Sequence, residues 1–158
     1  MAKTRKPLVL GDNGGMEQLQ PGDIIDVGAA KQVFTATNSN GGAITVGQVV
    51  YVDGAGSVDL AQANATATSN VIGLVNDTSI ASTSAGIIMT DGVIESADWT
   101  AVIGVASLTA GSTYFLDPVL AGGLTVTPTT TAGNSLVRVG VALSATSLEI
   151  TIDQPIKL

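Results

Sequence analysis

The regular alternation of short β-branched runs with turn-forming residues constrains the fold of this chain most. Val, Ile and Thr fill the runs, and Gly, Asn and Asp interrupt each run before it becomes long. β-branched side chains favour strands, and many short strands at this spacing are typical of a sandwich or a barrel. We therefore predict an all-β fold, a compact antiparallel sandwich or barrel. The predicted strands are residues 24–27, 31–36, 48–53, 57–61, 71–75, 86–90, 92–96, 102–106, 113–117, 124–127, 135–143 and 147–152.

The sequence around Trp99, the single tryptophan, is the one region where a helix competes with strands, over residues 95–102. The large indole of Trp99 is expected to fill the core of the protein. The alternative is that Trp99 anchors an interface with a partner, because tryptophan is enriched among residues that dominate binding energy.

The chain also contains an internal repeat. Residues 45–53 match residues 109–117 without a gap, with Thr, Gly and Asp in register and Tyr51 opposite Phe115. Each segment is followed by a turn containing Gly, a strand and a Thr-rich link, and then by a Gly set among hydrophobic residues. These later segments are residues 71–74 and 138–141, and residues 102–105 repeat the pattern a third time.

Each part of the repeat has a physical interpretation. The Thr-x-Gly sequence predicts a tight turn that enters a strand, and the Asp at the far end predicts the closure of the next turn. A Gly inside the later hydrophobic segment predicts a bulge or a close approach of another backbone. Two alternatives stay open: a duplication of units of roughly 60 residues, or chance similarity within a sequence rich in Val, Gly and Thr.

The residues available for chemistry predict a protein that is not an enzyme. The chain has no Cys and no His, so catalytic triads that use His, thiol nucleophiles and ordinary zinc sites are excluded. Most carboxylates lie in turns beside Gly, Pro or Asn; the pairs Asp53 with Asp59 and Asp91 with Glu95 are the only candidates for acid–base work. We expect no catalytic residue, no metal site and no cofactor.

The net charge of −7 and the pI of about 4.1 argue against direct binding of nucleic acid. No apolar run approaches the roughly 20 residues that span a bilayer, and the N-terminal apolar run is too short for the core of a signal peptide. We therefore expect no membrane contact, and synthesis in the cytoplasm without export.

Residues 1–23 differ from the rest, and we predict an extended N-terminal arm there and a β domain over residues 24–158. Half of the six basic residues of the chain lie in its first six positions, and an apolar run follows them. The arm is expected to become ordered on a partner surface; the alternative is a frayed terminus. The residues expected to bind are Lys3, Arg5, Lys6, Leu8, Val9 and Leu10.

The scarcity of large side chains predicts self-assembly. Aromatic residues make up only 3% of the chain, and Val, Ala and Thr each bury little area. Burial contributes roughly 25 cal/mol per Å², whereas ordering costs roughly 1.5 kcal/mol per residue. Contact with further copies, or with a lattice, would supply the missing buried area.

Several segments resemble structural proteins of tailed bacteriophages. Residues 18–23 (Gln-Leu-Gln-Pro-Gly-Asp) resemble an entry segment found in many of them, and residues 47–51, 71–75 and 91–93 are similar to segments of capsid decoration, or head cement, proteins. Residues 114–117, 122–125 and 137–144 resemble a module common in phage virion proteins. The resemblance covers most of the chain through short motifs.

The resemblance implies a virion structural protein on the capsid exterior, which binds the outer surface of the major capsid lattice and stabilises the phage head. It further implies a homotrimer whose arm lies along the shell of major capsid protein, and it brings no catalytic residues. The alternative is a head or tail fibre or baseplate component, including one that binds host glycans.

Overall fold

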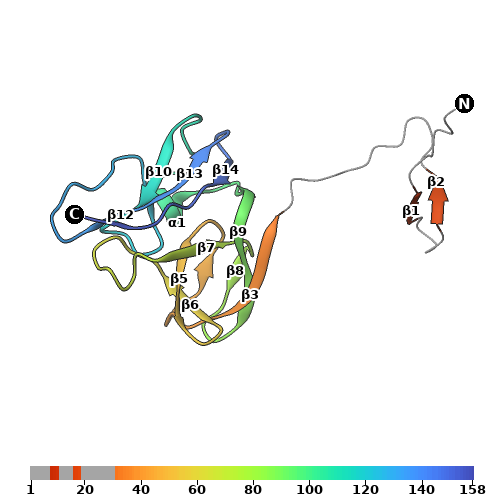
Figure 1. Cartoon of the computed structure of the whole chain (residues 1–158), viewed down its shortest axis with the longest axis horizontal. Helices are drawn as coiled ribbons and strands as arrows, with labels where there is room; N and C mark the ends of the chain where they lie inside the picture. The colour runs from red at the N-terminus through yellow and green to blue at the C-terminus, as the bar shows by residue number, and fades with distance from the viewer. Residues whose placement is uncertain (1–7, 11–15, 19–30) are drawn as a thin grey trace, which may run out of the picture.

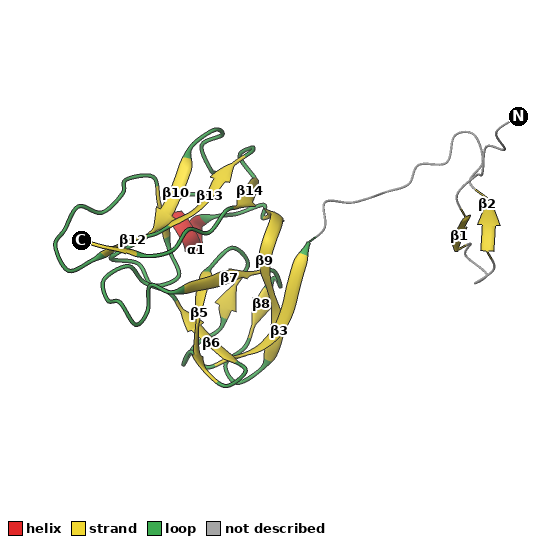
Figure 2. Cartoon of the chain, viewed as in Figure 1, coloured by secondary structure: helices red, strands yellow, loops and turns green. Residues whose placement is uncertain are grey.

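The computed structural model describes residues 8–10, 16–18 and 31–158, and this part of the chain is almost entirely β-structure (Figures 1 and 2). The all-β prediction is therefore confirmed. The elements are β1 (Leu8–Leu10), β2 (Met16–Gln18), β3 (Gln32–Asn38), β4 (Ile44–Thr45), β5 (Val49–Gly54), β6 (Ser57–Leu60), β7 (Val71–Val75), β8 (Ser79–Ile80), β9 (Ala85–Glu95), α1 (Thr100–Ile103), β10 (Thr113–Leu116), β11 (Leu124–Thr125), β12 (Ser135–Leu136), β13 (Arg138–Ala142), β14 (Ser147–Ile150) and β15 (Ile156–Lys157).

The main sheet of the described residues has nine strands in the order β11-β10-β13-β14-β9-β3-β6-β5-β7. Strand β9 also pairs with β7, which closes β9, β3, β6, β5 and β7 into a five-stranded barrel. The barrel was predicted as antiparallel, but β3 and β6 run parallel, so the barrel is mixed. Its interior is filled by small aliphatic side chains: Ala36, Ile44, Val50, Val58, Val75, Ile80 and Ile88.

The second unit is formed by the C-terminal half of β9 with β14, β13, β10 and β11. Its inward-facing side chains surround the indole of Trp99, and they include Tyr114, Leu116, Leu124, Ala142 and Leu148. The same core continues between the two units, where Val49, Leu74 and Met89 from the outer wall of the barrel join it. The two units therefore share one hydrophobic layer.

The two units repeat the same hydrogen bonds. The Gly47 N–H donates to the Val75 carbonyl (2.9 Å), and the Gly111 N–H donates to the Ala142 carbonyl (2.8 Å). Gly47 and Gly111 have left-handed φ angles of 83° and 78°, which a tight turn before a strand requires here. Strand β5 pairs with β7, and β10 with β13, with a register shift at the same place in both pairs. The repeat is thus a duplicated unit in three dimensions.

The Gly inside the later segment of each copy marks a close backbone approach, as predicted. A Cβ atom on Gly73 would overlap the carbonyl oxygen of Met89, and one on Gly140 would overlap the carbonyl oxygen of Glu149. Gly73 lies opposite Val50 at the register shift, and Gly140 lies opposite Tyr114. Neighbouring strands can meet this closely only because neither Gly carries a side chain.

The third apparent copy, residues 102–105, has a different structure, and the strand predicted at 102–106 was wrong. This segment forms the end of the short helix α1, and Gly104 terminates the helix with a left-handed φ of 77°. A helix does form beside Trp99, but it covers only Thr100–Ile103 and not the predicted 95–102, since residue 95 ends β9. Gly is favoured both after the last turn of a helix and at a β-bulge, so the residue pattern alone does not distinguish these two structures.

Three further differences concern strand limits. The strands predicted at 86–90 and 92–96 form one strand, β9, which continues through Gly92 at a φ of 108°. The strand predicted at 135–143 is divided into β12 and β13, and the pairings β4–β8 and β12–β15 were not predicted. The strand predicted at 24–27 and most of the arm 1–23 lie outside the described residues; of the arm, the structure describes β1 and β2, which form an antiparallel pair.

Replacement of Gly140 by Ala tests the close approach. We expect Gly140→Ala to lower the free energy of unfolding by about 2–3 kcal/mol, because the new Cβ meets backbone that cannot move aside. Gly41→Ala is the matched control, since a Cβ there meets nothing within 4 Å and should change stability by about 0.5 kcal/mol or less. Urea unfolding followed by circular dichroism measures both; equal effects would contradict the close approach.

Candidate functional site

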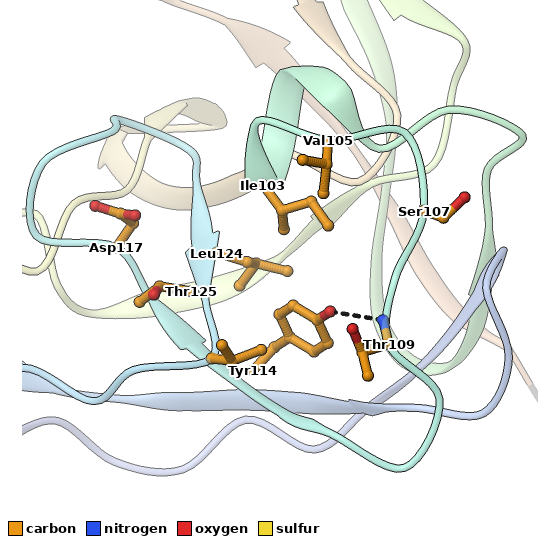
Figure 3. Close-up of a pocket in the computed structure, with 9 residues that line it drawn as sticks. Ile103, Val105, Ser107, Thr109, Tyr114, Asp117, Leu124 and Thr125 are labelled. Atoms are coloured by element: carbon orange, nitrogen blue, oxygen red, sulfur yellow. Dashed lines mark hydrogen bonds between the residues drawn. The ribbon is translucent and has the colours of Figure 1, made fainter.

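A hollow of about 240 Å³ opens beside β11 in the second unit (Figure 3). We call it the β11 groove, and it lies between β10 and β11 on one side and α1 with the segment that follows it on the other. Aliphatic side chains and hydroxyl groups line it together with one carboxylate. The lining residues are Ile103, Val105, Ser107, Thr109, Tyr114, Asp117, Leu124, Thr125 and Val126.

The β11 groove exists because the two units close differently. In the first unit, the end of β3 fills the corresponding place: the Thr37 N–H donates to the Gly56 carbonyl (2.9 Å), and the Ser39 N–H donates to the Val58 carbonyl (3.0 Å). In the second unit the chain leaves β9 and forms α1, which packs against β11. Among the described strands, β11 therefore ends the sheet with β10 as its only neighbour.

Two polar side chains of the β11 groove, Tyr114 and Asp117, are engaged in local structure. The Tyr114 hydroxyl oxygen accepts a hydrogen bond from the Thr109 N–H (2.9 Å). One oxygen of Asp117 accepts from the Val119 N–H (2.6 Å) and the Leu120 N–H (2.9 Å), which is the turn closure predicted for this Asp. A carboxylate that holds a turn in this way is poorly placed to act as a general base.

The rim of the β11 groove is apolar and exposed. Val105 is 58% exposed and Val126 is 51% exposed, whereas Leu124, which also lines the groove, is buried. Exposed aliphatic residues around a concave, partly apolar surface favour contact with another apolar group. The groove is therefore better suited to bind a hydrophobic segment than to perform chemistry.

Trp99 belongs to the core of the second unit. Its side chain is fully buried, and its Nε1–H donates to the Thr146 carbonyl (3.3 Å). This is the expected core-filling role. The indole is buried inside the chain, so the interface-anchor alternative finds no exposed indole surface among the described residues.

The two carboxylate pairs do not form an acid–base site. Asp53 accepts hydrogen bonds from the hydroxyls of Ser39 and Ser57, both at 2.7 Å, and these bonds hold the pKa of Asp53 below its usual value. Asp59 accepts from the Leu60 N–H (2.7 Å). Asp91 and Glu95 are exposed on β9, about 13 Å apart for four residues along a strand.

Two other pKa shifts also have local causes. Hydrogen bonds from the hydroxyl and N–H of Thr100 lower the pKa of Asp98. Burial, followed by the charges of Asp59 and Asp53, raises the pKa of Tyr51. None of these groups lines the β11 groove: Tyr51 and Asp53 lie on β5, and Asp98 lies just before α1.

Within the described ranges, no group of three or more acidic, His or Cys residues is arranged to hold a metal ion. The described part of the chain also contains no helix of the length and apolarity that crossing a bilayer requires. The side chains predicted to bind through the arm, from Lys3 to Leu10, lie outside the described side chains, so their role stays a prediction.

No protein-family model matches this chain, and no curated protein sequence matches it significantly.

Removal of the indole tests its supporting role. We expect Trp99→Ala to lower the free energy of unfolding by about 3–5 kcal/mol, because a large cavity opens inside the second unit. Val105→Ala, at the exposed rim of the same unit, should cost about 0.5 kcal/mol or less. Urea unfolding monitored by circular dichroism compares the variants. A loss for Trp99→Ala no larger than for Val105→Ala would show that the indole is dispensable.

Proposed function

We propose that this protein is a virion structural protein that binds the outer surface of a bacteriophage capsid lattice and stabilises the head. One observation carries the proposal: the segments that resemble phage virion proteins form the framework of both units. Residues 47–51 and 71–75, which resemble decoration proteins, contain the turn into β5 and the strand β7, and residues 137–144, which resemble a module of phage virion proteins in general, contain β13. The resemblance therefore falls on the residues that determine the fold.

The distribution of apolar residues supports self-assembly and contact with a shell. Both hydrophobic interiors are filled, yet many aliphatic side chains remain exposed on the strands and turns around them. They are Val33, Val52, Ile72, Ile87, Val105, Val119, Leu120, Val126, Leu143, Ile156 and Leu158. These side chains are available for burial against neighbouring subunits, and we propose a homotrimer on the lattice.

The charges support a position outside the shell and away from the genome. In residues 31–158 the cations are Lys31, Arg138 and Lys157, and nine carboxylates outnumber them. An acidic body is repelled by nucleic acid phosphates. The arm residues Lys3, Arg5 and Lys6 carry the opposite charge, and we propose that they contact the major capsid protein.

The side chains give no support to catalysis or to glycan stacking. Catalysis would need proton-transfer groups in a cleft, and the Asp117 carboxylate of the β11 groove holds a turn instead. Glycan binding by a fibre or baseplate protein favours exposed aromatic faces, but Trp99 and Tyr114 are buried and Phe34, Tyr51 and Phe115 are only partly exposed. The capsid proposal therefore has the stronger support.

Rebinding to heads that lack this protein tests the proposal. We expect the purified protein to occupy such heads and to raise their Tm, because a ligand that binds only the intact lattice stabilises it by mass action. Deletion of residues 1–10 should weaken attachment about tenfold, which corresponds to ~1.4 kcal/mol, while the circular dichroism spectrum of the β body stays unchanged. Sedimentation of occupied heads and calorimetry measure both effects.

Two results would contradict the proposal. Binding to tails or host cells in place of heads would favour a fibre or baseplate component. Unchanged occupancy after the deletion would show that the arm does not contact the capsid. Substitution of Lys3, Arg5 and Lys6 by Ser keeps the length of the arm and removes its charge, so it shows which of the two properties attachment needs.

A further inference from the structure

We propose that the β11 groove receives the strand β1 (Leu8–Leu10) of a second copy of this chain, which pairs with the free edge of β11. The inference rests on the proposed self-assembly and needs no capsid. It assigns an interaction surface to the place where the second unit is left open.

The first unit provides the template for this contact. There β6, the counterpart of β11, pairs in parallel with β3, with Thr37 opposite Ser57 and Asn38 opposite Val58. Gly56 before β6 and Gly122 before β11 have similar left-handed φ angles, 78° and 71°. The backbone before β11 thus resembles the strand-accepting segment of the first unit. The Gly122 carbonyl already accepts a hydrogen bond from the Val49 N–H (3.0 Å), so an added strand would pair with the backbone of Leu124 and the residues after it.

The chemistry of the β11 groove selects an aliphatic strand. Ile103, Val105, Leu124 and Val126 present apolar surface, and the volume of about 240 Å³ exceeds the ~150 Å³ of a cavity that binds benzene. One inserted aliphatic side chain therefore fits. Pairing with the backbone of β11 would satisfy its outward N–H and C=O groups, as in strand addition to other sheet edges.

Strand β1 has the matching properties. It consists of Leu8, Val9 and Leu10, and within the described residues its only partner is β2, so its other edge is open. The basic residues Lys3, Arg5 and Lys6 precede it, which suits an acidic body, and they stay available to the shell. A contact between two different surfaces of identical chains forms a closed ring when the rotation between neighbouring copies closes, and a trimer is one such ring.

Cysteine cross-linking between two variants tests the contact, because the chain contains no Cys of its own. One variant carries Val9→Cys and the other Val126→Cys, and the two full-length proteins are mixed and oxidised without capsids. Adjacent strands lie about 4.8 Å apart, within the range that a disulfide bridges. We expect about ten times more mixed dimer than with Leu143→Cys, whose site is 52% exposed and does not line the groove.

A yield equal to that of the Leu143→Cys control would overturn the proposal. So would a chain carrying both Val9→Cys and Val126→Cys that cross-links within itself at every dilution, since the arm would then occupy its own groove.

A second measurement does not depend on cross-linking. Val126→Asp places a charge in the apolar groove, and we expect it to weaken self-association about tenfold or more in analytical ultracentrifugation, with Leu143→Asp as control. Unchanged association of a folded Val126→Asp variant would count against the groove. Failure of these tests leaves capsid binding intact, because heads are absent from both, so the two proposals can fail separately.

Discussion

The two units depend on one strand, β9, which takes part in both. Its N-terminal half pairs with β3 on one side and β7 on the other, and its C-terminal half pairs with β14. Gly92 lies between the halves with a φ of 108°, a conformation that side chains disfavour. The strand can therefore change direction without interruption, and this places Ile88 inside the barrel and Ile94 inside the second unit.

Duplication explains the common framework, and the different closure of the copies explains the candidate site. The barrel is sealed by the parallel pair of β3 and β6. In the second unit the buried indole of Trp99 and Val102 of α1 occupy the interior, so the chain does not return to pair with β11. Both units have the same framework, but only in the barrel does a further strand, β3, pair with its edge, so the outer edge of β11 stays unpaired among the described strands. This asymmetry gives the chain two unlike surfaces that can join copies head to tail.

Much of the framework could be predicted from local residue patterns. The strand 71–75 has the predicted limits, and the turns at Gly47 and Gly111 and the close approaches at Gly73 and Gly140 follow from what Gly permits in a strand context. The candidate site could not be predicted in this way. Its walls come from residues as distant as Ile103 and Val126, and Asp117 shows a turn signal without showing that a groove lies beside it.

The sequence by itself determined where the chain extends, where it turns and which two segments share a structure, because these properties depend on backbone preferences of neighbouring residues. Only the tertiary structure decided that residues 102–105 end a helix while 71–74 and 138–141 cross a strand, that β3 runs parallel to β6, and that β11 has a free edge. These outcomes depend on which side chains fill a shared interior. In the barrel, small aliphatic residues fill the interior and β3 pairs with β6; in the second unit, Trp99 and Val102 fill the interior and no described strand pairs with the outer edge of β11.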